Sequence, residues 1–343
     1  MSDGVETHPD VSIVVVNFDG ADSIGACLAS LVVDATPRRE IFVVDNASRD
    51  GSAALVEHFA AGRSDLRLLR SATNRGYAGG VDLALPHCRG RYVAVLNMDL
   101  VVEPGWLDPL TAHLDRHPEV AAVNPLVTLR DGRRVNAAGQ WLHVTGLGFN
   151  RGLGRDRATF GAEPFAIAGL NGAAFVVRRA LLEQIGGMDT GGFLYHEDVN
   201  LSWLLRLMGH ELACVPTSAV RHDYFLSMHP EKLFLLERNR EAMLLTHLEA
   251  ATLRRLLGWR SITEALMWSY ALIRGPAFVR AKARARRWVR EQREQIEARR
   301  GLVARLRVRS DAEVMRPMSR RYPLAQLASL AGERGAPRRP LRD

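Results

Sequence analysis

The chain has 343 residues, 47% hydrophobic and 24% charged, so it is long enough to bury a core and is neither disordered nor fibrous. Its net charge is +8, and residues 251–343 hold 23 Lys and Arg against 8 Asp and Glu, which leaves 23 basic and 30 acidic residues in residues 1–250. A mildly acidic body therefore carries a strongly basic C-terminal region.

Cys27, Cys88 and Cys214 are far apart in the sequence and lack CxxC spacing. They predict neither a disulfide framework nor a zinc site, so a reducing cytoplasm is the expected environment.

The apolar runs of the sequence are short. Residues 1–10 are polar, and the run at residues 11–16 is too short for a signal-peptide core. The longest later run, residues 265–279, is interrupted by Arg274, Gly275 and Pro276 and is shorter than the roughly 20 residues of a spanning helix. We expect no secretion signal and no transmembrane span, whereas an interfacial helix is compatible with the pattern.

The first hundred residues alternate short β-branched runs with helical patterns. Strands are predicted at residues 11–16, 41–44, 66–69 and 92–96, and helices at residues 24–33, 53–59 and 78–85. This alternation predicts an α/β fold with a mostly parallel, Rossmann-like sheet flanked by helices. Ligands bind beyond the carboxyl ends of strands in such sheets. The polar residues expected at those ends are Asn17, Asp45, Asn46, Asn97 and Asp99.

The later part of the chain is irregular from about residue 120 to residue 220 and helical after it. Asp131 and Gly132 predict a hairpin turn, and Pro230 opens a helical region. Residues 251–309 predict helices dense in Arg. We expect four parts: a flexible N-terminus (1–8), a ligand-binding domain (9–250), a basic amphipathic helical region (251–331) and a flexible tail (332–343).

The first motif is V-V-D-N-A-S-R-D-G-S at residues 43–52, which places the carboxylate of Asp45 at a strand end before a turn and a predicted helix N-cap at Ser52. A carboxylate there can accept hydrogen bonds from a ribose or a pyrimidine edge. The alternative is an Asp that only stabilises its own turn.

The second motif is N-R-G-Y-A-G-G at residues 74–80, which sets the guanidinium of Arg75 among small residues at a helix start. Backbone N–H groups at a helix N-terminus favour an anion. A glycine-rich turn alone is weak support, but this one follows Asp45 by one βα unit.

The third motif is the strand V-L-N-M-D, which ends in Asn97 and Asp99. Oxygen-bearing side chains two residues apart at the mouth of a site can bind a hard divalent cation, which bridges a diphosphate. The alternative is an Asp that caps a helix beginning at Pro104.

The fourth motif runs from Gly186 to Leu201 and contains G-G-M-D, F-L-Y-H and the adjacent carboxylates Glu197 and Asp198 at a predicted helix start. A general base must reach the proton that it removes, and one of two adjacent carboxylates can face a site. The alternative is that the pair only complements the helix dipole.

Taken in order, the four motifs resemble the family 2 inverting glycosyltransferases with the GT-A fold, over roughly residues 9–250. Within that family the pattern is most similar to the bacterial rhamnosyltransferase-like branch, with its D-N-x-S-x-D-G-S and N-x-G-x-x-G-G turns, N-x-D in place of D-x-D, and F-x-x-x-E-D-x-D-L block. The resemblance implies a GT-A domain followed by a C-terminal helical extension.

The resemblance also implies a role for each matching position. The nucleotide-sugar site would be lined by Asn17, Asp45, Asn74, Arg75, Gly76 and Asn97. Asp99 would bind Mg²⁺ or Mn²⁺, and His222 would be a further metal ligand, with a structural histidine as the alternative. Asp198 would be the catalytic base and Glu197 its neighbour. In a single displacement, Asp198 would deprotonate an acceptor hydroxyl, which attacks the anomeric carbon as the nucleoside diphosphate leaves.

The chain departs from the family pattern at two positions. Asn97 is neutral where D-x-D has its first Asp, which puts the strictness of metal dependence in doubt. Asn200 stands where the E-D-x-D block has its second Asp, which puts a secondary acceptor contact in doubt.

The basic C-terminal region combines aromatic residues with closely spaced arginines on helical patterns. Such helices suit an anionic membrane surface, and lipid-linked acceptors are common in the branch that the chain resembles. We expect a peripheral enzyme on the cytoplasmic face of the inner membrane. The alternatives are a helical cap on the catalytic domain and a homodimer interface.

The sequence leaves alternatives for the donor sugar and for the class of protein. By resemblance dTDP-rhamnose is the first choice of donor, followed by UDP-hexoses and UDP-galactofuranose, and the acceptor would be a glycan or a polyprenyl-linked glycan in cell-envelope or polysaccharide synthesis. A nucleic-acid-binding protein is the alternative from another class, but no common recognition motif is present, and we expect no nucleic-acid partner. A dinucleotide-dependent oxidoreductase lacks its G-x-G-x-x-G after the first strand.

Overall fold

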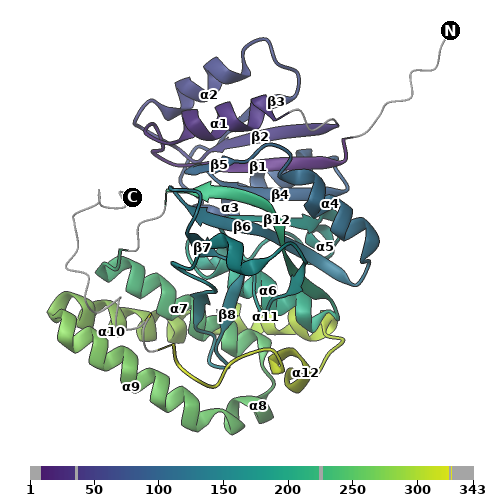
Figure 1. Cartoon of the computed structure of the whole chain (residues 1–343). Helices are drawn as coiled ribbons and strands as arrows, with labels where there is room; N and C mark the ends of the chain where they lie inside the picture. The colour runs from purple at the N-terminus through teal and green to yellow at the C-terminus, as the bar shows by residue number, and fades with distance from the viewer. Residues whose placement is uncertain (1–8, 35–37, 224–226, 324–325, 327–343) are drawn as a thin grey trace.

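The computed structural model describes residues 9–34, 38–223, 227–323 and 326. The predicted flexible segments at residues 1–8 and 332–343 lie outside these residues. Figure 1 shows a sheet with helices on both faces in one part of the molecule and a group of C-terminal helices beside it. The α/β fold class expected from the sequence is confirmed.

A ten-stranded sheet is the centre of the fold, with strand order β10-β12-β6-β11-β4-β1-β2-β3, β5 beside β12 and β7 beside β6. The strands are β1 (Val11–Asn17), β2 (Arg39–Asp45), β3 (Leu66–Arg70), β4 (Tyr92–Asn97), β5 (Leu100–Val102), β6 (Val120–Leu129), β7 (Val135–Ala137), β10 (Phe165–Ala166), β11 (Ala174–Arg178) and β12 (Glu211–His222). A separate hairpin pairs β8 (Gln140–Leu142) with β9 (Gly148–Asn150).

The half of the sheet from β3 to β4 is parallel, as the βαβ pattern predicts. Beyond β4 the sheet is mixed, because β11 pairs antiparallel to both β4 and β6 while β12 runs parallel to β6. The predicted hairpin turn at Asp131 and Gly132 joins the antiparallel strands β6 and β7. The residues of β1 are all buried, which explains its uninterrupted β-branched run.

Helices cover both faces of the sheet, and alternate residues of β1 point to each face. Ile13 and Val15 pack with α1 (Ile24–Val33), α2 (Ser52–Ala60) and α4 (Leu107–Arg116). Val14 and Val16 pack with α3 (Gly76–Ala84), α5 (Arg179–Gln184) and α6 (Glu197–Leu207), and α7 (Pro230–His247) adds Met243 and Leu244 to the same core. The fold is therefore a three-layer sandwich.

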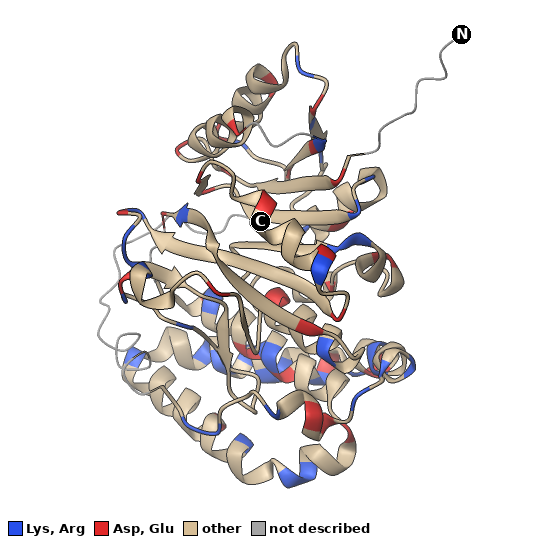
Figure 2. Ribbon diagram, turned by 45° about the vertical axis from the view of Figure 1, so that its right-hand side comes forward, with Lys and Arg blue, Asp and Glu red and all other residues tan. Residues whose placement is uncertain are grey.

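The basic region is helical. Its helices are α8 (Ala250–Arg255), α9 (Leu257–Arg274), α10 (Pro276–Glu291), α11 (Arg293–Leu306) and α12 (Asp311–Met315). Helices α10 and α11 pack against α7. Figure 2 shows Lys and Arg gathered on these helices, whereas the strands are largely uncharged. Among the described residues, none of the helices is both long enough and apolar enough to cross a bilayer.

Candidate functional site

The carboxyl ends of β1, β2 and β4 meet at one edge of the sheet. The strand registers place Asn17 beside Asp45, and Val16 beside Asn97. Residues separated by tens of positions in the sequence therefore end at one level, as expected for parallel strands.

Asn17 is fully buried, and its amide is used within the protein. Nδ2 lies 3.2 Å from Asp45 Oδ1, 3.1 Å from Ser48 Oγ and 2.9 Å from Ser52 Oγ. The predicted N-cap at Ser52 is wrong: Gly51, with a φ of +86°, takes that position, and Ser52 is the first residue of α2. A left-handed backbone favours glycine there. Asn17 thus fixes the turn that carries Asp45.

Asn46 joins this turn to the second motif. Its Nδ2 donates to Asn74 Oδ1 at 2.9 Å and to the carbonyl of Gly76 at 2.9 Å, and its Oδ1 accepts from the Arg75 N–H at 2.9 Å. The Arg75 side chain is exposed, and Asn74 is half-buried. Both Asn74 and Arg75 therefore lie at the accessible edge, held there by an asparagine that the sequence motif had not singled out as a site residue.

Gly76 is required by a close backbone approach. Its φ is +72°, and a Cβ atom would lie 1.9 Å from the carbonyl oxygen of Phe193. The next residue, Tyr77, donates its N–H to that same carbonyl at 2.8 Å and its hydroxyl to the Gly172 carbonyl at 3.0 Å. The second motif thus contacts the fourth, more than a hundred residues away.

The third motif lies opposite His222. Asp99 follows β4 and precedes β5, which pairs with β12 so that Leu100 is beside His222. Since a strand follows it, Asp99 does not cap a helix at Pro104, and α4 begins at Leu107. Asp99 Oδ1 lies 3.2 Å from His222 Nε2, and Asn97 is half-buried two residues earlier.

The Asp99 and His222 pair fits a cation. His222 Nδ1 is 3.0 Å from Asn136 Oδ1, and if that nitrogen donates, Nε2 presents a lone pair to the carboxylate. Asp99 Oδ1 is buried and accepts no hydrogen bond. Carboxylate oxygen suits Mg²⁺ and Mn²⁺, and imidazole is also a common ligand of divalent metals. No third Asp, Glu, His or Cys of the described chain completes a cluster, so water or substrate oxygens would supply the other ligands.

Asp198 is the most heavily hydrogen-bonded carboxylate of the site. Its Oδ2 accepts from the Gly172 N–H at 2.8 Å and from Gln140 Nε2 at 2.6 Å, and its Oδ1 accepts from the Val199 N–H at 2.8 Å. Burial raises the pKa of Asp198, whereas these donors favour its charged form. Gln140 and Gly172 come from the irregular part of the sequence, where no motif marked them.

Glu197 differs from its neighbour. Its Oε2 is buried without a hydrogen-bond partner, and burial followed by the charge of Asp198 raises the pKa of Glu197 to about 8. The donors to Asp198 favour its charged form, whereas Glu197 Oε2 receives no hydrogen bond. The two adjacent carboxylates, both at the start of α6 as predicted, therefore have different surroundings.

The backbone before the carboxylate pair is strained. Phe193, Tyr195 and His196 have φ values of 62°, 66° and 75°, a region that costs about 1–3 kcal/mol for residues other than glycine. Asn239 of α7 compensates: its Nδ2 lies 2.9, 3.1 and 2.8 Å from the carbonyl oxygens of Gly192, Leu194 and Tyr195. Nothing local in the sequence pointed to Asn239.

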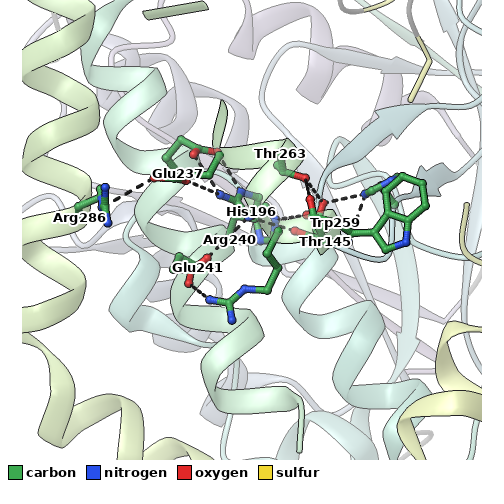
Figure 3. A network of polar contacts seen from close by, with 12 residues as sticks. Thr145, His196, Glu237, Arg240, Glu241, Trp259, Thr263 and Arg286 are labelled. Carbon is green, nitrogen blue, oxygen red and sulfur yellow. Dashed lines mark hydrogen bonds and ion pairs between the residues drawn. The ribbon is translucent and has the colours of Figure 1, made fainter. Parts of the chain in front are cut away.

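Charged residues of α7 extend this support into the C-terminal helices (Figure 3). Arg240 donates to Glu237 at 2.9 and 3.0 Å and to the Thr145 carbonyl at 3.1 Å. His196 Nε2 contacts the neighbouring Gly146 carbonyl at 2.7 Å, and burial lowers the pKa of His196 to about 4, so the ring is neutral and donates. The buried network thereby reaches the residue preceding Glu197.

Comparison with known proteins agrees with this geometry. The family described as "Glycosyl transferase family 2" matches residues 12–186. A pre-mycofactocin glycosyltransferase of Mycobacterium tuberculosis is 30% identical over 223 residues, which are 64% of this chain and 43% of that protein. An N-acetylglucosaminyl-diphospho-decaprenol L-rhamnosyltransferase of the same organism is 27% identical over 235 residues, which are 61% of this chain and 75% of that protein.

Two solved structures share the fold. GalNAc-T7 with UDP, GalNAc and Mn²⁺ is 16% identical, with a TM-score of 0.62 over 95% of this chain and 59% of that chain. The mannosyltransferase PcManGT of Pyrobaculum calidifontis, in complex with GDP-Man and Mn²⁺, is 20% identical, with a TM-score of 0.54 over 87% of each chain. The matches favour a transferase over a nucleic-acid-binding protein or an oxidoreductase.

Proposed function

Since the chain belongs to glycosyl transferase family 2 and is a glycosyltransferase, we propose that it transfers a sugar, with inversion, from a nucleoside-diphosphate donor to a hydroxyl of a glycan or lipid-linked glycan. The observation that carries this proposal is the pair of adjacent carboxylates at the start of α6, of which Asp198 is held by three hydrogen-bond donors and Glu197 Oε2 is buried without one.

Asp198 is the general base of the proposed reaction. Its carboxylate is oriented by three donors and takes a proton from the acceptor hydroxyl, whose oxygen forms a bond to the anomeric carbon as the bond to the diphosphate breaks. Attack from the face opposite the leaving group inverts the anomeric centre. Burial and the neighbouring Asp198 raise the pKa of Glu197, which disfavours a second negative charge beside the base.

The donor lies along the carboxyl ends of β1, β2 and β4. Asp45 accepts hydrogen bonds from the nucleoside, and Asn17 positions Asp45, because its Nδ2 is bonded within the protein and its Oδ1 is buried. The exposed guanidinium of Arg75 pairs with the diphosphate, with Asn74 beside it. Gly76 contributes by letting the backbone of the second motif lie against the Phe193 carbonyl.

Asp99 and His222 would hold Mg²⁺ or Mn²⁺, with Asn97 nearby, and the ion would offset the charge that develops on the diphosphate. Asn97 and His222 are both uncharged ligands when His222 is neutral, so only Asp99 contributes a negative charge. We therefore expect weak retention of the metal in the absence of donor.

The donor sugar of this proposal is rhamnose, supplied as dTDP-rhamnose. The rhamnosyltransferase aligned over 75% of its length supports this choice, and its name also supports a polyprenyl-linked acceptor. UDP-hexoses and UDP-galactofuranose are the alternative donors. An acceptor of this kind belongs to cell-envelope or polysaccharide synthesis and places the enzyme at the cytoplasmic face of a membrane.

A donor panel tests the proposed function. The purified protein is incubated with dTDP-rhamnose, UDP-glucose, UDP-galactose or UDP-galactofuranose, with and without Mn²⁺, while thermal shift and nucleotide release are measured. We expect stabilisation by one donor, larger with Mn²⁺, and release of its nucleotide. If no donor binds and no nucleotide is released by the wild type, the proposed chemistry is wrong; release from a UDP-sugar alone would overturn only the choice of rhamnose.

A further inference from the structure

Helix α9 differs from an ordinary surface helix because its exposed face carries no charged residue. Its exposed residues, spaced so that they share one face, are Leu257, Gly258, Ser261, Ile262, Ala265, Ser269, Leu272 and Ile273. None of these residues is charged. We call this set the outer face of α9. A surface helix normally presents charged side chains to water and apolar ones to the core.

The charged residues of α9 instead face the protein. Glu264 accepts from Lys282 Nζ of α10 at 2.7 Å, and Arg260 is paired with Glu241 of α7. Arg274 donates to the Met228 carbonyl at 3.3 Å. Thr263, on the same side, is buried and donates to Thr145 Oγ1 at 2.9 Å. Because these polar contacts orient the helix, the outer face cannot turn inward without breaking them.

The outer face holds a large share of the exposed apolar side chains. Leu257, Ile262, Leu272 and Ile273 are 57%, 48%, 66% and 77% exposed, and they are four of the eight large hydrophobic residues exposed in the described part of the chain. The other four are scattered on separate elements. An apolar strip of this kind marks contact with an apolar partner or a membrane.

The neighbouring helix α10 presents the opposite character to solvent. Its exposed residues include five arginines, Arg280, Arg284, Arg286, Arg287 and Arg290, and one acid, Glu291. Contacts of Lys282 and Arg286 with Glu264 hold α10 alongside α9. An uncharged apolar strip therefore lies beside a strongly cationic one, which is the pattern of an interfacial helix on anionic lipid.

A groove of about 350 Å³ separates the two helices and is lined by Leu257 and Ser261 of α9 and by Arg286 and Arg290 of α10. The carboxylates that also line it, Glu237, Glu241 and Glu264, are each paired with a cation. Arg286 and Arg290 are thus placed where phosphate groups would lie if the outer face entered the lipid.

We propose that the outer face of α9 docks on an anionic lipid bilayer, with α10 supplying the cations that contact the headgroups. A second copy of the chain is the less favoured occupant, because a two-fold contact through α9 would bring the arginines of both α10 helices together. This inference deepens the proposed function, since a polyprenyl-linked acceptor lies in a membrane, and it places the protein on the bilayer without crossing it.

Vesicle flotation of the full chain tests the docking surface. Wild type is mixed with phosphatidylcholine vesicles or with vesicles containing phosphatidylglycerol, and is compared with L272E/I273E. The matched control is Val33→Glu, which changes another exposed apolar residue, on α1. We expect recovery with the anionic vesicles alone, about tenfold weaker binding of L272E/I273E, and no change for the control.

A charge variant and two further readouts complete the test. R280Q/R290Q should also weaken binding, and added salt should weaken that of the wild type. Thermal unfolding and nucleotide release from the donor without vesicles should be unchanged in L272E/I273E, so loss of docking is distinguished from loss of catalysis. Equal flotation of wild type and L272E/I273E would overturn the proposal, as would a vesicle-free dimer of the wild type that L272E/I273E abolishes.

Discussion

Two glutamates on neighbouring helices, the half-buried Glu197 of α6 and the buried Glu237 of α7, have pKa values shifted in opposite directions. Burial opposes ionisation in both. At Glu197 the nearest charge is the carboxylate of Asp198, and the pKa rises to about 8. At Glu237 the cations Arg240 and Lys282 reverse the effect of burial and lower the pKa to about 2.

The contrast separates a reactive region around Glu197 from a structural region around Glu237. Near Glu197, two buried carboxylate oxygens of the proposed site, Asp99 Oδ1 and Glu197 Oε2, accept no hydrogen bond. Around Glu237 each carboxylate is matched by a cation, and the network holds α7, α9 and α10 together. Buried carboxylates without a cation partner are typical of a reactive site, and buried carboxylates paired with cations are typical of a structural network.

The largest expected effect is on the rate of sugar transfer, when the proposed base in the reactive region is replaced. Asp198→Asn should lower sugar transfer by about 10²–10⁴-fold, the usual contribution of a general base, because the amide cannot accept the proton. Donor binding, measured by calorimetry or thermal shift, should be preserved. Glu197→Gln is the matched control and should lose far less activity, since it mimics the protonated side chain. Near-normal turnover of Asp198→Asn would remove it from the mechanism.

Substitutions in the structural region around Glu237 should lower the stability of the fold. Glu237→Ala leaves Arg240 and Lys282 buried beside an empty position, so the free energy of unfolding should fall by about 3–5 kcal/mol in denaturant titrations. The exposed pair Arg70 and Glu57 supplies the control, and Glu57→Ala should cost less than about 1 kcal/mol. Equal losses in the two variants would contradict the distinction between the networks.

Asn239 connects the two regions, since it lies on α7 and bonds the strained segment before Glu197. Asn239→Ala removes the donor to three carbonyls and should destabilise the fold by about 1–3 kcal/mol and lower kcat about tenfold, with little change in donor affinity. Arg238→Met, which removes a bond to the Gly192 carbonyl and one to Asn239 Oδ1 but keeps the three bonds that Asn239 donates, should have a smaller effect on kcat. A change in donor affinity alone would argue against a positioning role.

The smallest expected effect is a difference in pH dependence. The raised pKa of Glu197 stabilises the fold below the unfolded value of 4.5, and this contribution is lost as the pH rises towards about 8. Glu197→Gln, which cannot ionise, should therefore become more stable relative to the wild type as the pH rises through this range. The lowered pKa of Glu237 acts in the other direction: its contribution is present above pH 4.5 and is lost as the pH falls towards about 2. Unfolding titrations across pH would reveal both slopes; a Glu197→Gln curve parallel to that of the wild type would contradict the raised pKa.

Much of the site was accessible from the sequence because its residues lie in short motifs. Asp45, Asn97 and Asp99 follow apolar runs that could only be buried strands, and parallel strands bring their carboxyl ends together. Glu197 and Asp198 were expected at a helix start, and α6 begins at Glu197. The strand registers and the helix boundary confirm these positions, while the roles of the residues stay predictions.

The hydrogen-bond partners of these residues could not be predicted from the sequence in the same way. Gln140 and Gly172 are 58 and 26 residues from Asp198, and Asn239 bonds three carbonyl groups that are 44 to 47 residues away. The sequence placed Asn46 at a strand end but did not indicate its bonds to the second motif. A contact of this kind leaves no periodicity in the sequence. The N-cap predicted at Ser52 was wrong for a related reason, because the left-handed turn at Gly51 shifts the helix start by one residue.

The sequence by itself determined the alternation of strands and helices, the polar strand ends and the concentration of arginine after residue 250, because these depend on local pattern and composition. The tertiary structure alone decided which side of α9 faces the protein. An amphipathic helix has two faces in any surroundings. Partners on other elements, among them the buried Lys282 and the half-buried Glu241, hold the charged face of α9 inward and leave its apolar face outward.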